Sequence, residues 1–156
     1  MAAIELQRAD TSWLELRRSD GRIHSWIRRG LTGPADVRGP FTEILGLAGL
    51  TSEAKVKERR LIDLGQFVKG SGATLVAAQQ DYLSLQETLR AAYEETQGNP
   101  RAMRVHAPLY GIASGYWTLN VEWLNTIEQD PIAGFQQLTT ARFICIDSPP
   151  DWTAVP

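Results

Sequence analysis

The chain has 156 residues, of which 43% are hydrophobic and 22% are charged, and its formal net charge is -2. This length and composition favour a single domain with one apolar core and exclude a mainly disordered chain. The lack of a basic excess argues against a nucleic-acid-binding protein, because phosphate neutralisation dominates such binding. No stretch approaches the roughly 18 apolar residues that indicate a membrane span.

The N-terminal third is predicted to form strands and a long loop. Ser12 to Arg17 and Arg22 to Ile27 alternate between apolar and polar residues, and the Asp20-Gly21 pair between them favours a tight turn. A β-hairpin is therefore expected from Ser12 to Ile27. The segment from 30 to 54 holds five glycines and two prolines, which disfavour helix, so a long loop with short strands is expected there.

The middle of the chain predicts one strand followed by one helix. From Arg59 to Lys69 the apolar residues occupy alternate positions, and Gly65 among them indicates a bulge or a close backbone approach. Between Ala77 and Thr96 apolar residues recur at steps of three and four among good helix formers, which predicts an amphipathic helix. The apolar face of this helix would consist of Tyr82, Leu85, Leu89, Ala92 and Tyr93.

The C-terminal third returns to strand patterns. Ala102 to Ala107, Tyr116 to Leu124 and Thr139 to Asp147 are the expected strands. On the second of these, one face is predicted to pack against the helix; it consists of Trp117, Leu119, Val121 and Trp123. The prolines in residues 148–156 exclude a central strand there. The predicted fold class is α+β, with a β-sandwich or a strongly bent antiparallel sheet and one packed α-helix.

Nothing in the sequence predicts a catalytic, cofactor-binding or metal site. His24 and His106 lie far from each other and from the single cysteine, Cys145, whereas zinc needs three or four clustered ligands. The glycines that precede the helix, Gly70 and Gly72, lack the Gly-Lys-Ser/Thr ending of a phosphate loop. Ser114 does not stand in the Gly-x-Ser-x-Gly pattern of a nucleophile elbow. We therefore expect a protein that is not an enzyme and needs no cofactor.

An assembly role explains two features that a small core does not require. The chain has five tryptophans, a residue type enriched at interface hot spots, and its arginine pairs flank the hairpin and the loop. These arginine pairs could bind phosphates, but the missing basic excess favours protein partners. Across a subunit boundary the arginines could form salt bridges with Glu94, Glu95, Asp147 and Asp151. The predicted subunit-interface residues are Arg17, Arg18, Trp26, Arg28, Arg29, Val37, Phe41, Arg59, Arg60 and Trp152.

The order of several segments is similar to the N-terminal, ring-forming domain of siphophage distal tail and minor tail proteins. In that family a glycine-bearing loop, matched here by Val37 to Glu43 and Gly46 to Gly49, leads to an Arg-Arg strand that ends in Gly. Arg59 to Gly70 matches this strand. A helix and paired strands follow, and a Pro-x-Trp-like ending comes last, as from Asp147 to Trp152.

The resemblance implies a structural virion protein, made in the host cytoplasm and built into a phage tail. It implies a hexameric ring at the distal end of the tail tube, with the tail tube protein, the tail-tip hub and the tape-measure protein as partners. The expected domain organisation is one ring-forming α+β domain over residues 1–147 and a Pro-rich C-terminal tail over 148–156. The missing basic excess predicts no specific nucleic-acid binding. Two alternatives stay open: a tail-tube or tail-terminator subunit and, from a different class, a small nucleic-acid-binding or enzyme-like α+β domain.

Overall fold

The computed structural model describes residues 4–30, 36–38, 41–43, 50–52, 56–106, 115–128, 134–145, 147 and 151–156. These residues form eleven strands and one helix. In chain order they are β1 (Ile4–Gln7), β2 (Trp13–Glu15), β3 (Ile23–Arg29), β4 (Asp36–Arg38), β5 (Phe41–Glu43), β6 (Leu50–Ser52), β7 (Val56–Lys69), α1 (Leu75–Glu94), β8 (Arg101–His106), β9 (Tyr116–Glu128), β10 (Gln136–Cys145) and β11 (Thr153–Val155).

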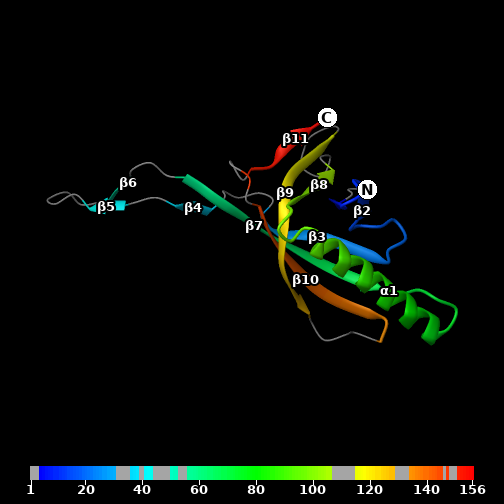
Figure 1. Cartoon of the computed structure of the whole chain (residues 1–156). Helices are drawn as coiled ribbons and strands as arrows, with labels where there is room; N and C mark the ends of the chain where they lie inside the picture. Colours follow the sequence, from blue (N-terminus) through cyan, green and yellow to red (C-terminus); the bar gives the residue numbers. More distant parts are fainter. Residues whose placement is uncertain are drawn as a thin grey trace.

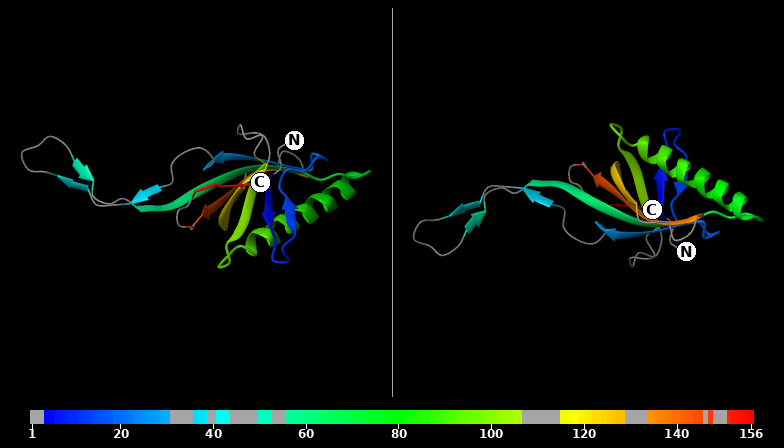
Figure 2. Two further views of the ribbon diagram at one scale, coloured as in Figure 1. Left: turned by 90° about the horizontal axis from the view of Figure 1, so that it is seen from above. Right: turned by 90° about the horizontal axis from the view of Figure 1, so that it is seen from below.

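Nine of the strands belong to one antiparallel sheet with the order β2-β1-β8-β9-β10-β7-β3, to which β4 adds beside β7 and β11 beside β9. The long strand β9 joins the two halves of this sheet (Figure 1). Its first part, Tyr116 to Val121, pairs with β8, and its second part, Glu122 to Glu128, pairs with β10. Helix α1 lies on one face of the sheet (Figure 2).

This arrangement corrects the predicted fold class. The prediction of an α+β protein with a β-sandwich or a strongly bent sheet and one packed helix is wrong, because hydrogen bonding joins nine of the eleven described strands into one open antiparallel sheet. The observed fold is mainly antiparallel sheet with a single described helix, and it fits an α+β description only broadly. Alternation along a strand shows which face is buried but does not show which strand lies beside it, so the number of sheets could not be read from the sequence.

The predicted hairpin from Ser12 to Ile27 is also wrong. Its turn forms, with Gly21 at a φ of 71°, where glycine avoids the strain of a side chain. The two strands then part, because β2 pairs with β1 and β3 pairs with β7, at opposite ends of the sheet order. The missing partner is β1, whose four residues are too few to give a periodicity in the sequence.

The predicted helix is confirmed and begins at Leu75, two residues before the expected start. Thr74 caps it, because its side-chain oxygen accepts a hydrogen bond of 3.1 Å from the backbone N–H of Ala77. Asp81 lies within the helix and connects it to neighbouring segments of the chain. Its carboxylate binds Arg22, with an Nε–O distance of 3.1 Å, and accepts the backbone N–H of Ser71 at 2.8 Å. These contacts fix the start of α1 against the turn before β3.

The core lies between α1 and the sheet, and the predicted packing of the helix face against β9 is confirmed there. Leu119 and Val121 are 4% and 0% exposed and share a cluster with Leu85, Leu89 and Tyr93. Trp123 packs against this cluster from its margin. Trp117, the fourth residue of the predicted face, is only partly buried, and its indole N–H has no hydrogen-bond partner among the described residues.

An arm extends from the sheet on the side away from α1 (Figures 1 and 2). We define the arm as β4, β5, β6 and the first residues of β7, where Asp36 pairs with Arg59 and Arg38 with Val56. At its far end β5 and β6 form a separate two-stranded sheet. The segment that was predicted as a long loop with short strands, residues 30–54, therefore carries three short strands in its described part.

Glu95 fastens the turn after β1 to the end of α1. Its carboxylate accepts the Arg8 guanidinium at 2.5 and 2.9 Å and the backbone N–H of Ala9 at 2.9 Å. The bond from Arg8, followed by the one from Ala9, lowers the pKa of Glu95 from the ordinary 4.5 to about 2. A depressed folded pKa means that this carboxylate stabilises the fold above about pH 4.5 and loses that contribution as the pH falls through about 2.

We expect Glu95→Gln to lower the free energy of unfolding at pH 7, because an amide binds the Arg8 guanidinium less strongly than a carboxylate does. The gap between wild type and variant should shrink as the pH falls below about 4.5 and close near about 2. Urea unfolding at a series of pH values measures this gap. Glu15→Gln is the control, since Glu15 is exposed and has no ion pair among the described residues. A pH-independent gap would show that the carboxylate charge plays no part.

Candidate functional site

The sheet face that points away from α1 carries two exposed apolar side chains, Trp26 and Ile127, in one row across the strands. Trp26 on β3 is 36% exposed and lies over Gly65 of β7, where an added Cβ would stand 2.6 Å from Trp26 Cε2. The close approach that Gly65 predicted is therefore confirmed, although a side chain rather than a backbone makes it. The row continues across the register through Thr140 on β10 to Ile127 on β9, which is 49% exposed.

A positively charged cluster adjoins this row. Asp63 accepts hydrogen bonds from Arg142 at 2.7 and 3.1 Å, and these bonds hold the pKa of Asp63 below its ordinary value. The nearby charges of Arg29 and Arg28 lower it further. Arg28 also donates to the Thr140 hydroxyl at 3.2 Å. One carboxylate thus stands among three guanidinium groups, and β3 brings together three of the predicted interface residues, Trp26, Arg28 and Arg29.

Two other predicted interface residues serve contacts within the chain. Arg60 is 7% exposed, and its guanidinium donates to the Gly30 carbonyl at 3.1 Å and pairs with Asp151 at 3.1 Å. The Trp152 indole N–H donates to the same carbonyl at 2.9 Å. Because β11 then pairs with β9, these contacts fasten the C-terminal segment along the sheet. Arg60 and Trp152 are therefore brought together at the end of β3.

The remaining predicted residues are spread over the molecule. Arg18 pairs with Asp20 at 2.8 Å, and the Arg17 Nε is buried without a hydrogen-bond partner among the described residues. Arg59 on β7, Val37 on β4 and Phe41 on β5 belong to the arm. Four acids were expected to form salt bridges with these arginines across a subunit boundary, and each has a partner in its own chain. Glu94 binds Arg90, Glu95 binds Arg8, Asp147 accepts a hydrogen bond from Asn120, and Asp151 binds Arg60.

The described residues hold no group of three His, Cys, Asp or Glu side chains that could bind a metal ion. His24 and His106 stand beside Trp26 and Tyr116, with ring centroids 6.2 and 5.3 Å apart. Burial raises the pKa of the Cys145 thiol to about 11, which disfavours the reactive thiolate. Ser114 lies outside the described residues. None of the helical residues that the structure describes forms a helix long and apolar enough to cross a membrane.

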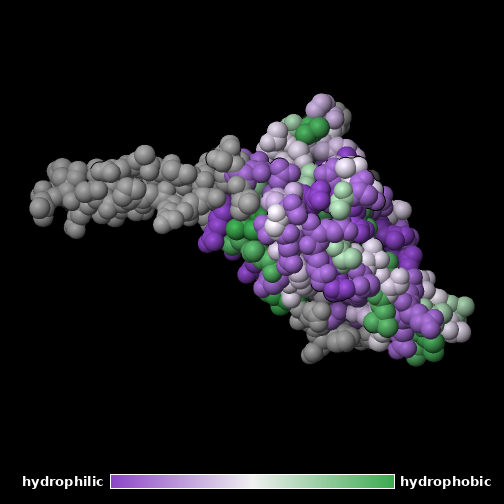
Figure 3. Space-filling model, in the orientation of Figure 1, coloured by the Kyte–Doolittle hydropathy of each residue, from purple (hydrophilic) through white to green (hydrophobic). Residues whose placement is uncertain are grey.

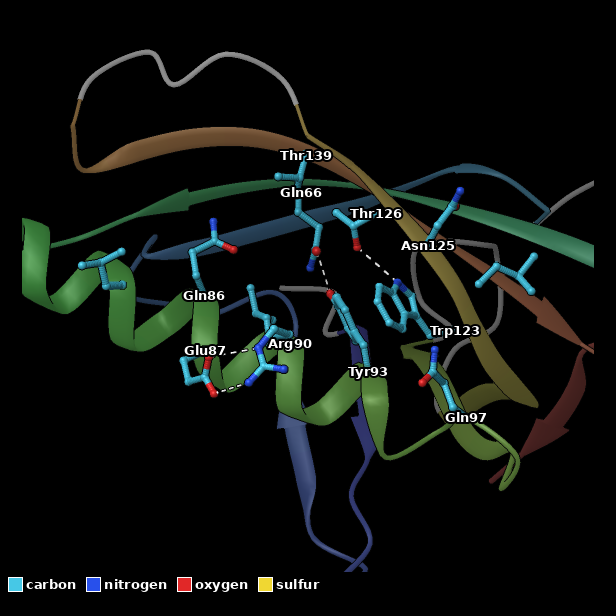
Figure 4. Close-up of a pocket in the computed structure, with 13 residues that line it drawn as sticks. Gln66, Gln86, Glu87, Arg90, Tyr93, Gln97, Trp123, Asn125, Thr126 and Thr139 are labelled. Carbon is cyan, nitrogen blue, oxygen red and sulfur yellow. Dashed lines mark hydrogen bonds and ion pairs between the residues drawn. The ribbon is translucent and has the colours of Figure 1, made fainter.

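A groove of about 600 Å³ runs between α1 and the second part of β9 (Figure 4). Its floor is a polar seam, in which the Tyr93 hydroxyl donates to Gln66 at 2.6 Å and Gln66 donates to Ser25 at 3.0 Å. The groove is lined by Gln66, Leu83, Gln86, Glu87, Leu89, Arg90, Tyr93, Gln97, Trp123, Leu124, Asn125, Thr126 and Thr139. Leu83 and Leu124 indicate this groove in the sequence, because they are apolar but lie outside both predicted apolar faces.

The rim of the groove is partly apolar and lies beside an unpaired strand edge. Leu83 on α1 and Leu124 on β9 are 63% and 46% exposed. Since β8 begins at Arg101, opposite Val121, no described strand pairs with the second edge of β9 from Glu122 onward. Further apolar surface occurs at the start of α1, where Leu75 and Val76 are 62% and 61% exposed, and Figure 3 shows an apolar area over this end of the helix.

Comparison with solved structures gives a likeness in fold. No family model and no curated protein matches the chain. Its fold is similar to the crystal structure of the Dit (gp 19.1) protein of SPP1, with a TM-score of 0.61. The two chains are 13% identical, and the likeness covers 95% of this chain and 51% of the Dit chain. Dit is described as a paradigm of the hub adsorption apparatus in phages that infect Gram-positive bacteria.

At this level of identity the likeness shows the fold alone. The chain shares the fold of Dit over nearly its whole length, and it spans about half the length of the Dit chain. The resemblance noted in the sequence is therefore supported for the fold, while the particular tail-protein family is not shown.

Proposed function

We propose that this protein is a structural component of the tail of a long-tailed phage, and that it forms a ring at the distal end of the tail tube that joins the tube to the tail-tip hub. The observation that carries the proposal is the likeness to Dit, a phage hub protein, over 95% of the chain. The proposed ring is hexameric, its partners are the tail tube protein, the hub and the tape-measure protein, and its place is the virion.

The surfaces of the molecule support an assembling protein rather than an enzyme. The sheet ends in β2 and β3, each with one strand partner among the described strands, and such edges invite pairing with another chain. On β3, Trp26, Arg28 and Arg29 present an exposed aromatic ring and two exposed guanidinium groups. Trp and Arg are the residue types enriched at interface hot spots. In this proposal residues 1–147 form the ring domain and residues 148–156 its C-terminal tail.

We expect the double variant Trp26→Ser with Arg28→Ser to weaken self-association about tenfold or more, because hot-spot truncation costs at least about 2 kcal/mol. Sedimentation over a range of concentrations measures the association. Urea unfolding of the monomer accompanies this measurement, because Trp26 is only 36% exposed and also packs over Gly65 of its own chain.

Leu75→Ser with Val76→Ser is the matched control, because it also removes exposed residues but at the start of α1. If the control weakens association as much as the β3 variant does, the β3 face is not the contact surface.

A further inference from the structure

We propose that the groove between α1 and β9 binds the β5–β6 hairpin of a second copy of this chain. The inference rests on the proposed function, because it names the segment and the site that join neighbouring copies. Five observations on the sequence and the structure carry it: the open edge of β9, the chemistry of the groove, the low charge of the hairpin, its lack of other partners among the described strands, and its position.

The first observation is the open edge of β9. From Glu122 to Glu128 this strand pairs with β10 on one side only, and its other edge lies beside the groove (Figure 4). At the start of this edge the backbone N–H of Trp123 donates to the Thr96 hydroxyl at 2.8 Å and is already satisfied. Beyond Trp123, an extended segment laid in the groove can add to β9 as a strand, which supplies main-chain hydrogen bonds.

The second observation is the chemistry of the groove. The side-chain amides of Gln97 and Asn125 have no hydrogen-bond partners among the described residues, and an amide can both donate to and accept from a peptide backbone. Leu83 and Leu124 on the rim offer apolar contact. The charged lining is balanced, because Arg90 pairs with Glu87 and Glu94, each at 2.5 Å. The groove thus suits an extended, apolar and nearly uncharged peptide.

The third observation is the composition of the hairpin. Between Phe41 and Ser52 the sequence is Phe-Thr-Glu-Ile-Leu-Gly-Leu-Ala-Gly-Leu-Thr-Ser, with Glu43 as its single charge. The segment that follows, Glu53 to Arg60, has six charged residues among eight. The hairpin therefore matches the balanced groove, since burying it leaves few charges without partners.

The fourth observation is the isolation of the hairpin. β5 and β6 pair only with each other among the described strands. A two-stranded hairpin is marginally stable by itself in water, and it gains stability when a further strand or a helix packs on it. The groove supplies both, with β9 on one wall and α1 on the other.

The fifth observation is the position of the hairpin. The arm holds it on the side of the sheet away from α1, so it points away from the groove of its own chain (Figure 1). The groove that it occupies therefore belongs to another copy. A contact in which the arm of one copy enters the groove of the next is head-to-tail, and such contacts generate a ring when the rotation closes.

Cross-linking between two variants of the full chain tests the inference. One carries Leu124→Cys in the groove and the other Thr51→Cys in β6, and a size tag distinguishes them. The native Cys145 is retained, because it is buried and 0% exposed. Ser19→Cys, at an exposed turn before β3, replaces the groove variant in the control. We expect the mixed Thr51→Cys and Leu124→Cys sample to give a disulfide-linked heterodimer at least about tenfold more abundant than the mixed control gives.

A second pair of variants tests the same contact without cross-linking. Replacing residues 42–51 by a Gly-Ser linker and, separately, substituting Leu124→Arg should each weaken self-association about tenfold or more, whereas Leu75→Arg should not.

If assembly persists but Thr51→Cys links no better to the groove than to Ser19→Cys, the inference is wrong and the proposed function stands. If only the linker variant fails to assemble, the hairpin binds elsewhere. If the wild-type chain stays monomeric at every concentration, both proposals fail.

Discussion

Leu119→Asp is expected to unfold the protein at pH 7. Leu119 is 4% exposed on β9 and belongs to the core cluster that includes Leu85, Leu89 and Tyr93 of α1. A carboxylate at this position would be buried without a cation, which costs several kcal/mol in addition to the lost apolar packing. Because domains are stable by only about 5 to 15 kcal/mol, this loss removes most of the available stability. Far-UV circular dichroism and urea unfolding measure the result.

The matched control is the same substitution on the same strand. Leu124→Asp places a carboxylate where the leucine is 46% exposed, so water still solvates the charge. The control should keep the circular dichroism spectrum of the wild type and lose about 1 kcal/mol or less. A soluble and fully folded Leu119→Asp protein would mean that the faces of β9 are reversed relative to the structure.

Gly70→Ala is expected to be the second most harmful substitution, although it adds a single methyl group. An added Cβ would stand 1.9 Å from the Ala78 carbonyl oxygen and 2.7 Å from the Tyr82 nitrogen, which are both backbone atoms of α1. The backbone N–H of Gly70 also donates to the Phe135 carbonyl at 2.8 Å, so the strand end cannot move away freely. The expected loss is about 3 kcal/mol, at the upper end of the cost of overpacking.

Gly134→Ala is the control for this substitution. Its Cβ would meet the Gln79 Nε2 atom at 2.7 Å, but that atom is the far end of a flexible side chain that can turn aside. Since Ala also restricts the unfolded chain more than Gly does, the control should change the free energy of unfolding by about 0.5 kcal/mol or less. Thermal and urea unfolding compare the two variants. Equal losses would show that α1 does not pack closely on the end of β7.

The elements that the sequence predicted well are those with long, regular patterns. β7 and β9 alternate over many residues, and the helix repeats its apolar positions over five turns, so local spacing alone fixes their type and their buried faces. Gly65 is a smaller success of the same kind. A glycine inside a strand pattern indicates close approach, and the Trp26 ring makes that approach.

The pairing of the strands could not be predicted, because it depends on contacts between distant parts of the chain. Asp20-Gly21 favours a turn whether or not its flanking strands pair, and here β2 pairs with β1 instead of β3. β1 itself has four residues and shows no usable pattern. The single open sheet depends on how β9 shares its edges between β8 and β10, which no local spacing encodes.

The candidate site was predictable only in part for the same reason. Arginine and tryptophan composition drew attention to Trp26, Arg28 and Arg29, which do share one exposed region of β3. The same reasoning applied to Arg60 and Trp152, which instead meet the Gly30 carbonyl inside the chain, because composition cannot distinguish a buried arginine from an exposed one. The groove arises where α1 passes beside β9, so its lining residues come from four separate elements and the turn after α1.

The measurement that tests the proposed ring most directly is the mass and shape of the purified full-length chain in solution. Native mass spectrometry over a range of concentrations gives the mass, and negative-stain electron microscopy of the same samples gives the shape. The proposal predicts a species of six times the 17.3 kDa chain mass that appears as closed rings with a central opening. A chain that remains at 17.3 kDa at every concentration, with no rings in the micrographs, would contradict it.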